Sequence, residues 1–242
     1  MKRWAIVLAI LVIVLGVAGA AGLPLAEVRL ADALKSRLEQ EGTAKVAAVE
    51  VGILQRRIVL KDLVLAELGD NEIKAAKVEA RGLGWPLAEF LAGRTPFTGW
   101  RWGDPLQAEH VEITDLHLRN EFEQGEWRVA RLVFEGVDLP RYQPLDSPAP
   151  GSLAQPVLAI SHLSLRRFEG YGLVFQSLDG EGLGIKIASV ILERLRKGEI
   201  DSLAFASTEI RERAGNPSPW LSVAEVVARK VDLRSPLDKL KD

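Results

Sequence analysis

The 242-residue chain contains no cysteine, one methionine and two tyrosines, and aromatic residues make up only 6% of it. Without thiols it can form no disulfide, zinc–thiolate site or iron–sulfur cluster. It also lacks an excess of charge of one sign, because 31 Lys and Arg residues stand against 33 Asp and Glu residues. Nucleic-acid binding through a basic patch is therefore not expected. The 48% hydrophobic and 26% charged residues are typical of a globular chain.

One long apolar run is present. Lys2 and Arg3 precede nineteen consecutive residues without charge or strongly polar group, Ala5 to Leu23. At about 1.5 Å per residue this helix would be roughly 28 Å long, which matches the hydrocarbon core of a bilayer. We predict a transmembrane signal-anchor at residues 1–23, single pass in a bacterial inner membrane, with the body in the periplasm. The alternative is a signal peptide cleaved near Ala18-Gly19-Ala20, which would release the body into the periplasm.

Residues 24–43 predict an amphipathic helix that ends at Gly42. Leu30, Leu34 and Leu38 recur at helical spacing, with charged residues on the other faces. We expect this leucine stripe to pack on the domain that follows. The alternative is a helix that lies on the membrane surface beside the anchor.

From residue 44 onward the apolar period changes from helical to two, and one eight-residue pattern recurs. Its first, third, sixth and eighth positions are apolar. It occurs in six windows, which begin at Ile58, Val78, Val111, Leu132, Leu163 and Val226, and only Gly170 breaks it. Segments 128–139 and 222–233 also share Val-Ala, Val and Val-Asp-Leu at matched positions, which predicts copies of one structural unit.

The step of three inside the pattern interrupts strict alternation. One extra residue, a β-bulge, would return all four apolar side chains to one face, and Asp62, Gly82, Asp115 and Gly136 occupy that gap. A sheet with a bulge in strand after strand is expected to curl strongly.

Residues 44–242 are therefore predicted to form a mainly β, largely antiparallel periplasmic domain of eight to eleven strands, as an open groove or a flattened barrel. Further strands are expected at 47–54, 172–176 and 201–210, and short helices at 86–93 and 188–197. The proline-rich segment 140–156 is a candidate sub-domain boundary.

The apolar face of such a sheet needs a cover, and two short helices are too few to provide it. The core is then either a closed, dry sheet or an open groove that holds bound acyl chains. At about 4.8 Å per strand, a groove of ten strands would be roughly 50 Å long.

The order of these elements resembles the start of AsmA-like envelope proteins, over residues 1–139. The similar features are the anchor, the amphipathic helix, the hairpin of Val49–Leu54 and Arg57–Leu65, the segment Ile73–Leu83 with Trp85-Pro86, and the strand phrases Ala108–Leu118 and Arg128–Leu139. Members of that family are anchored in the inner membrane and carry phospholipid in a long apolar β-groove. The resemblance implies a non-enzymatic protein that binds or transfers acyl chains of phospholipid or fatty acid. The alternative is a structural adaptor of an envelope complex, with a closed core and other envelope proteins as partners.

The residues expected to line the lipid site are the apolar positions of the first strands. They are Leu60, Leu63, Leu65, Val111, Ile113, Leu116, Leu118, Leu132, Phe134, Val137 and Leu139. Trp100 and Trp102, in a polar glycine-rich loop, are a candidate membrane or protein contact. No catalytic motif, cofactor or metal site is expected, since His110, His117 and His162 lack ligand spacing with acidic residues.

Overall fold

The computed structural model describes residues 24–40, 44–66, 71–84, 101–120, 125–145, 154–178, 182–212 and 218–233. Within these residues ten strands form one antiparallel sheet, which confirms the mainly β, antiparallel part of the predicted fold and the predicted strand number. The strands are β1 (Ala44–Lys45), β2 (Ala48–Gly52), β3 (Arg57–Ala66), β4 (Asn71–Arg81), β5 (Leu106–Asn120), β6 (Gly125–Leu139), β7 (Ser164–Ser177), β8 (Gly184–Arg196), β9 (Glu199–Arg211) and β10 (Leu221–Asp232). The helix α3 (Ala154–His162) precedes β7, and another helix covers residues 24–40.

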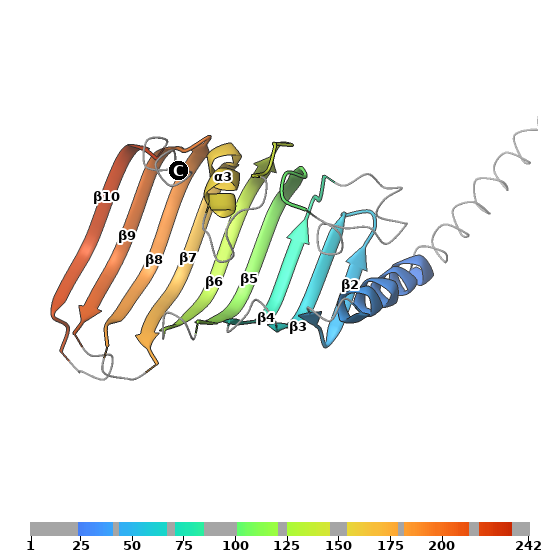
Figure 1. The fold of residues 1–242 in the computed structure, drawn as a ribbon, viewed down its shortest axis with the longest axis horizontal. Helices are drawn as coiled ribbons and strands as arrows, with labels where there is room; N and C mark the ends of the chain where they lie inside the picture. Colours follow the sequence, from blue (N-terminus) through green and yellow to red (C-terminus); the bar gives the residue numbers. More distant parts are fainter. Residues whose placement is uncertain are drawn as a thin grey trace, which may run out of the picture.

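The sheet is a simple meander. From β3 onward each strand pairs with the next one in the chain, and β1 and β2 pair with the two halves of β3 in one register. β6 and β7 are neighbours, so the sheet continues across the segment 140–156. Figure 1 shows the strands side by side, with β2 and β10 at opposite ends. The predicted strong curl and the flattened barrel are therefore wrong, because the sheet stays open from its first strand to its last.

The interruption in the eight-residue pattern is a backbone kink. In five of the six windows the fifth residue has a positive φ angle. These residues are Asp62 (49°), Gly82 (60°), Asp115 (50°), Gly136 (60°) and Lys230 (55°). A residue in this conformation shifts the alternation of side chains between the two faces by one residue. Ile113 and Leu116, three residues apart, therefore point to the same face and pack into the same cluster.

The kinks are not bulges, which corrects the sequence prediction. Between β4 and β5, for example, Lys77 pairs with Thr114 and Ala75 with Leu116, so Ala76 lies opposite Asp115 and neither strand has an extra residue. The other strand pairs keep one register across their kinks in the same way. Because an extra residue is absent, the strong strand-to-strand curl that bulges produce is absent as well.

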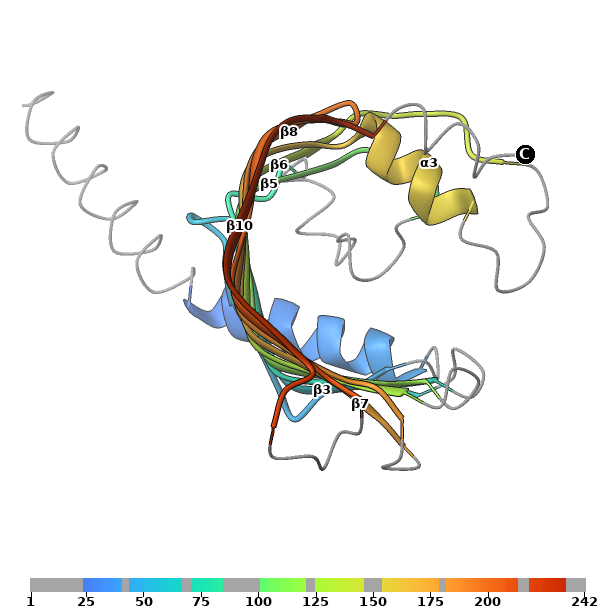
Figure 2. The same ribbon diagram turned by 90° about the vertical axis from the view of Figure 1, so that its left-hand side faces the viewer.

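The kinks line up across the sheet in two rows. Along the first kink row, left-handed residues alternate with exposed alanines: Ala47, Asp62, Ala76, Asp115, Ala130, Gly172, Ala188, Ser207 and Ala224. The second kink row contains Gly82, Glu109, Gly136, Arg166, Arg194, Asp201 and Lys230, again with every other residue left-handed. The strands β5 to β10 therefore bend at the same two levels, and Figure 2 shows the resulting arc along the strands.

Close contact between strands explains the small residues in the first kink row. A Cβ atom added at Gly172 would lie 3.0 Å from the Cβ of Ala130, which is tighter than ordinary van der Waals contact. Where the left-handed residue has a side chain, as at Asp62, Asp115 and Ser207, the residue opposite is an alanine. In the first kink row, each left-handed residue therefore lies opposite a small residue of the adjacent strand.

The 24–40 helix packs on the inner side of the arc, as Figure 2 shows. Leu30, Leu34 and Leu38 are 6%, 1% and 6% exposed and contact residues of β3 and β4 such as Ile58 and Leu60. The expected packing of the leucine stripe on the domain is confirmed. We name the inner side of the sheet the concave face and its opposite the convex face.

Several local predictions have clear outcomes. Segments 47–54 and 201–210 are strands, but 172–176 continues β7 instead of forming a strand of its own. The helix predicted at 188–197 is wrong, because these residues belong to β8. Apolar steps of two and three across the two kinks of β8 imitate helical spacing. The short helix at 86–93 lies outside the described residues, and α3 was not predicted.

No helix in the described part of the chain has the length and apolar character needed to cross a membrane. The anchor predicted at residues 1–23 lies outside that part.

A kink residue tests this account of the bend. Replacing exposed Asp115 by Val should lower the free energy of unfolding by about 1–2 kcal/mol, because a β-branched residue resists the left-handed conformation. Asp115→Gly, which removes the same carboxylate but tolerates a positive φ, should change it by less than about 0.5 kcal/mol. Urea denaturation measures both, and equal losses in the two variants would contradict a left-handed kink at this position.

Candidate functional site

The concave face is an uninterrupted apolar surface built from in-register rows. The apolar residues nearest each kink on its two sides, such as Leu60 and Leu63 around Asp62, both point to this face. The strands therefore contribute pairs of apolar side chains. One such row is Ile58, Ala80, Val111, Phe134, Phe168, Leu192, Leu203 and Ala228. The next is Leu60, Val78, Ile113, Leu132, Gly170, Val190, Phe205 and Val226. This surface is the largest apolar feature among the described residues.

The two ends of the concave face differ in how they are covered. Over β1 to β5, the side chains of the sheet form one buried cluster with the 24–40 helix; Ile58 is 0% and Ala80 1% exposed. We name this region the covered half. On β6 to β10, which we name the open half, most concave side chains are only half-buried, and Val226 at the end of the row is 46% exposed.

A second cluster in the open half contains aromatic rings. The rings of Phe134 and Phe168, which pack in this cluster, lie 5.0 Å apart. Trp127 and Phe175 form a separate pair of rings on the same two strands, also 5.0 Å apart. Leu192 and Leu203 are partly buried against this cluster. The open half therefore offers large, rigid apolar side chains on a surface that the 24–40 helix does not reach, and α3 lies on the inner side of the arc only near one end of the strands (Figure 2).

The predicted lining residues lie mostly in the covered half. Those that pack into the cluster with the 24–40 helix are Leu60, Leu63, Leu65, Val111, Ile113, Leu116 and Val137. Phe134 packs in the second cluster, and Val137 contacts both clusters. Leu118 and Leu132 are half-buried and Leu139 is buried. The structure thus brings the predicted residues onto one surface, but most of them are in contact with the chain's own helix.

The predicted lining residues stop at β6 and omit the apolar residues of β7 to β9, although Phe168 was in a predicted window and 201–210 was a predicted strand. The most prominent omitted residues are Phe168, Leu192, Leu203 and Phe205. The signal was present, because β8 repeats the same steps of two and three between its apolar residues at Ile185, Ile187, Val190, Leu192 and Leu195. It was read as a helix and was therefore not added to the apolar face.

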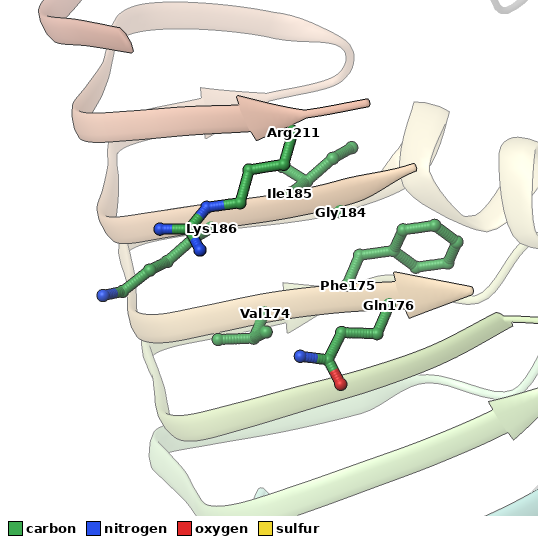
Figure 3. Close-up of a pocket in the computed structure, with 7 residues that line it drawn as sticks. All are labelled: Val174, Phe175, Gln176, Gly184, Ile185, Lys186 and Arg211. Carbon is green, nitrogen blue, oxygen red and sulfur yellow. The ribbon is translucent and has the colours of Figure 1, made fainter. Parts of the chain in front are cut away.

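A hollow of about 140 Å³ lies at one end of β7, β8 and β9. Figure 3 shows the ring of Phe175 and the side chain of Ile185 directed to one side of it, and the charged ends of Lys186 and Arg211 to the other. Arg211 is held by Glu209 at 3.0 Å. The two apolar side chains thus belong to the concave face and the two cations to the convex face.

The convex face is charged and closely paired, in contrast to the concave face. Its most buried member is Glu79, 1% exposed, whose carboxylate lies 2.7 Å from Arg57 Nε, 2.6 Å from Lys77 Nζ and 2.6 Å from Arg81 Nε. Burial opposes ionisation, but the hydrogen bonds from these cations outweigh it and hold the pKa of Glu79 well below its usual range. The stems of these long side chains cover Val59, which is fully buried on the same face.

The remaining candidate residues lie away from the apolar surface. Trp102 is 44% exposed, and Trp100 lies outside the described residues. The Nε2 atoms of His110 and His117 lie 3.5 and 2.7 Å from carboxylate oxygens of Glu112 and Glu126, and the ring of His162 stacks on that of Tyr142 at 5.2 Å. These contacts give each histidine a structural partner.

Comparison with known proteins assigns no family. No protein-family model matches the chain, and no curated protein matches it. The similarity to AsmA-like proteins therefore enters only as part of the proposal below.

Glu79 makes a pH-dependent prediction. Because its pKa is lowered on folding, its contribution to stability is present above about 4.5, the ordinary value, and is lost as the pH falls below it. Glu79→Gln should lower the free energy of unfolding by about 1–3 kcal/mol at pH 7. The gap between wild type and this variant should then narrow between pH 5 and 3. Glu193→Gln, at a carboxylate 56% exposed, is the control and should cost less than about 0.5 kcal/mol. A gap that stays constant with pH would contradict the prediction.

Proposed function

We propose that the protein binds lipid acyl chains on the open half of its concave face. In this proposal it is a non-enzymatic, AsmA-like protein, anchored in the bacterial inner membrane by residues 1–23, with its sheet in the periplasm. Phospholipid or fatty acid is the ligand, and the protein holds or passes on the acyl chains within the cell envelope.

The observation that carries the proposal is the unequal cover of one apolar surface. The rows that the 24–40 helix buries over β3 and β4 continue without a polar break to Phe205 and Val226. Monomeric proteins rarely expose continuous apolar surface of this kind unless it binds a partner, a membrane or a ligand. An acyl chain could cover the open half in the way that the helix covers the other half.

The shape of the face favours an elongated apolar ligand over a compact polar one. Apart from Thr208, the side chains that the open half presents on the concave face are aliphatic and aromatic, and the nearby cations Lys186 and Arg211 belong to the convex face. Apolar burial gains about 25 cal/mol per Å² without directional contacts, so such a face would select for acyl chains and not for one headgroup.

The adaptor alternative was based on a closed, dry core. The two ends of the sheet are far apart in chain order and do not pair with one another. An open sheet cannot bury its apolar face by closing on itself, so we favour a bound ligand as the cover of the open half.

A photo-crosslinker can test the site in the full chain within native membranes. Replacing Phe205 with benzoylphenylalanine keeps an aromatic ring on the concave face, and the same substitution at the neighbouring Ala204 places it on the convex face. After irradiation, mass spectrometry should find a phospholipid or fatty-acid adduct at position 205 at least about tenfold more often than at position 204.

This pair is a matched control, because the two residues are neighbours on β9 and differ in the face of the sheet to which they belong. Adducts at both positions in equal amounts would indicate contact with bulk lipid only. That result, or the absence of an adduct at position 205, would overturn the proposal.

A further inference from the structure

The last strand of the sheet has one unused edge. β10 pairs with β9 on one side, and among the described residues no strand pairs with its other side. Its apolar residues are unusually exposed for this sheet: Leu221 is 43%, Val226 46% and Val227 48% exposed. A twelve-residue edge with free backbone groups and exposed valines is a template for another strand.

Charge on this edge is also incomplete. Elsewhere the convex face carries cross-strand ion pairs, such as Arg131 with Glu112 at 3.2 Å and Arg194 with Asp201 at 3.1 Å. On β10, Glu225 and Arg229 lie opposite Ala206 and Ser202 of β9. Neither has an ion-pair partner in the part of the chain that the structure describes.

We propose that β10 pairs antiparallel with β10 of a second copy of this chain, around a two-fold axis at Val227. In this register Glu225 lies opposite Arg229 of the second copy, and Arg229 opposite its Glu225. Each unpaired charge on the edge thus gains an opposite charge directly across the new strand pair.

The same register extends the apolar face. Residue numbers of opposed residues sum to 454, so Val226 meets Ala228, Val223 meets Val231 and Leu221 meets Leu233 of the second copy. All these residues belong to the concave face: the pairing with β9 shows this for those of β10, and Leu233 packs in the second cluster on that face. A two-fold axis normal to the sheet keeps the concave faces of both copies on the same side.

The kinks supply an independent constraint on the register. β10 has its two kink positions at Ala224 and Lys230, six residues apart and symmetric about Val227. The two-fold axis therefore places left-handed Lys230 of each copy opposite Ala224 of the other. This repeats the rule of the first kink row, in which each left-handed residue stands opposite a residue that is not left-handed, and most often opposite an alanine.

Head-to-tail stacking fits less well. All neighbours in the sheet are antiparallel, and an even number of steps separates β1 and β2 from β10, so both end strands run in the same direction. Stacking β10 on β2 of another copy would require a parallel pair in an antiparallel sheet. It would also place Ala224 against Ala47 with no left-handed residue between them. The β1–β2 edge is further interrupted at Val46 and Ala47.

The dimer would change the shape of the apolar surface. The two open halves would join at the centre, and the two 24–40 helices would cover the outer ends. The charge and kink arguments concern only the strand edge, so the dimer does not depend on the lipid proposal. If both hold, one continuous concave face would be available to longer or paired acyl chains.

Charge variants test the register. Glu225→Arg and Arg229→Glu each place like charges opposite one another in both halves of the dimer, so each should weaken self-association of the full chain by about tenfold or more. An equimolar mixture of the two variants should associate again, because one copy then carries two arginines and the other two glutamates. Sedimentation velocity in detergent measures both effects. Single variants that associate like wild type, or a mixture that does not associate, would overturn the proposal.

A cysteine on the symmetry axis provides a second readout. The chain has no cysteine, so Val227→Cys introduces a single thiol that would face its own copy across the axis. Directly opposed residues in antiparallel pairs have Cα atoms about 4.5–5.5 Å apart, within the roughly 4.4–6.8 Å that a disulfide spans.

Mild oxidation in native membranes should convert most of the Val227→Cys chain to a disulfide-linked dimer. Ser222→Cys, on the same strand and face but opposite Asp232 in the proposed register, should remain monomeric. No crosslink at position 227, or an equal crosslink at position 222, would show that β10 does not pair in this way.

Discussion

The structure depends on a row of left-handed residues that lie in register across the sheet. A single left-handed residue in one strand would disturb its neighbours, but here every strand bends at the same level and the ladders resume on the other side in the same register. The sheet therefore bends along its strands without curling from strand to strand. The bend separates an apolar concave face from a charged convex face, and the small residues of the first kink row permit the strands to approach one another there.

From this constraint follows the asymmetry between the two ends of the molecule. The 24–40 helix is short relative to the sheet and buries the concave side chains of β3 and β4, with Leu34 at the centre of the contact. The same apolar rows continue beyond its reach to a strand edge on which Val226 and Val227 are half exposed. The 24–40 helix leaves two surfaces uncovered. The proposed ligand would cover the concave face of the open half, and the proposed second copy would cover the edge of β10.

Much of this architecture could be predicted from the sequence, because its signals are local. The leucine stripe of the 24–40 helix, the antiparallel strands and the positions of the kinks at Asp62 and Asp115 follow from spacing alone. The nature of the kink could not be predicted, since a bulge and an in-register kink leave the same pattern in one strand and differ only in the strand beside it. The apolar residues of β8 were assigned to a helix because two kinks within thirteen residues imitate a helical period.

The extent of the candidate site was also beyond sequence reasoning. Ile113 and Phe134 have the same pattern of neighbours in the chain, yet the first packs with the helix cluster and the second with the aromatic cluster of the open half. Where the 24–40 helix docks decides which residues stay available, and that depends on tertiary packing. The charges of Glu225 and Arg229 show the same limit, because only the register with β9 reveals that no opposite charge faces them.

The most direct test of the central claim is mass spectrometry of lipid extracted from the protein itself. Residues 24–242 would be exported to the periplasm, purified without detergent and extracted with organic solvent. The account predicts at least about one phospholipid or fatty acid per folded chain, and much less after Phe205→Asp than after Ala204→Asp. A folded chain with no more lipid than an unrelated control protein would contradict the claim that the open half is a lipid-binding surface.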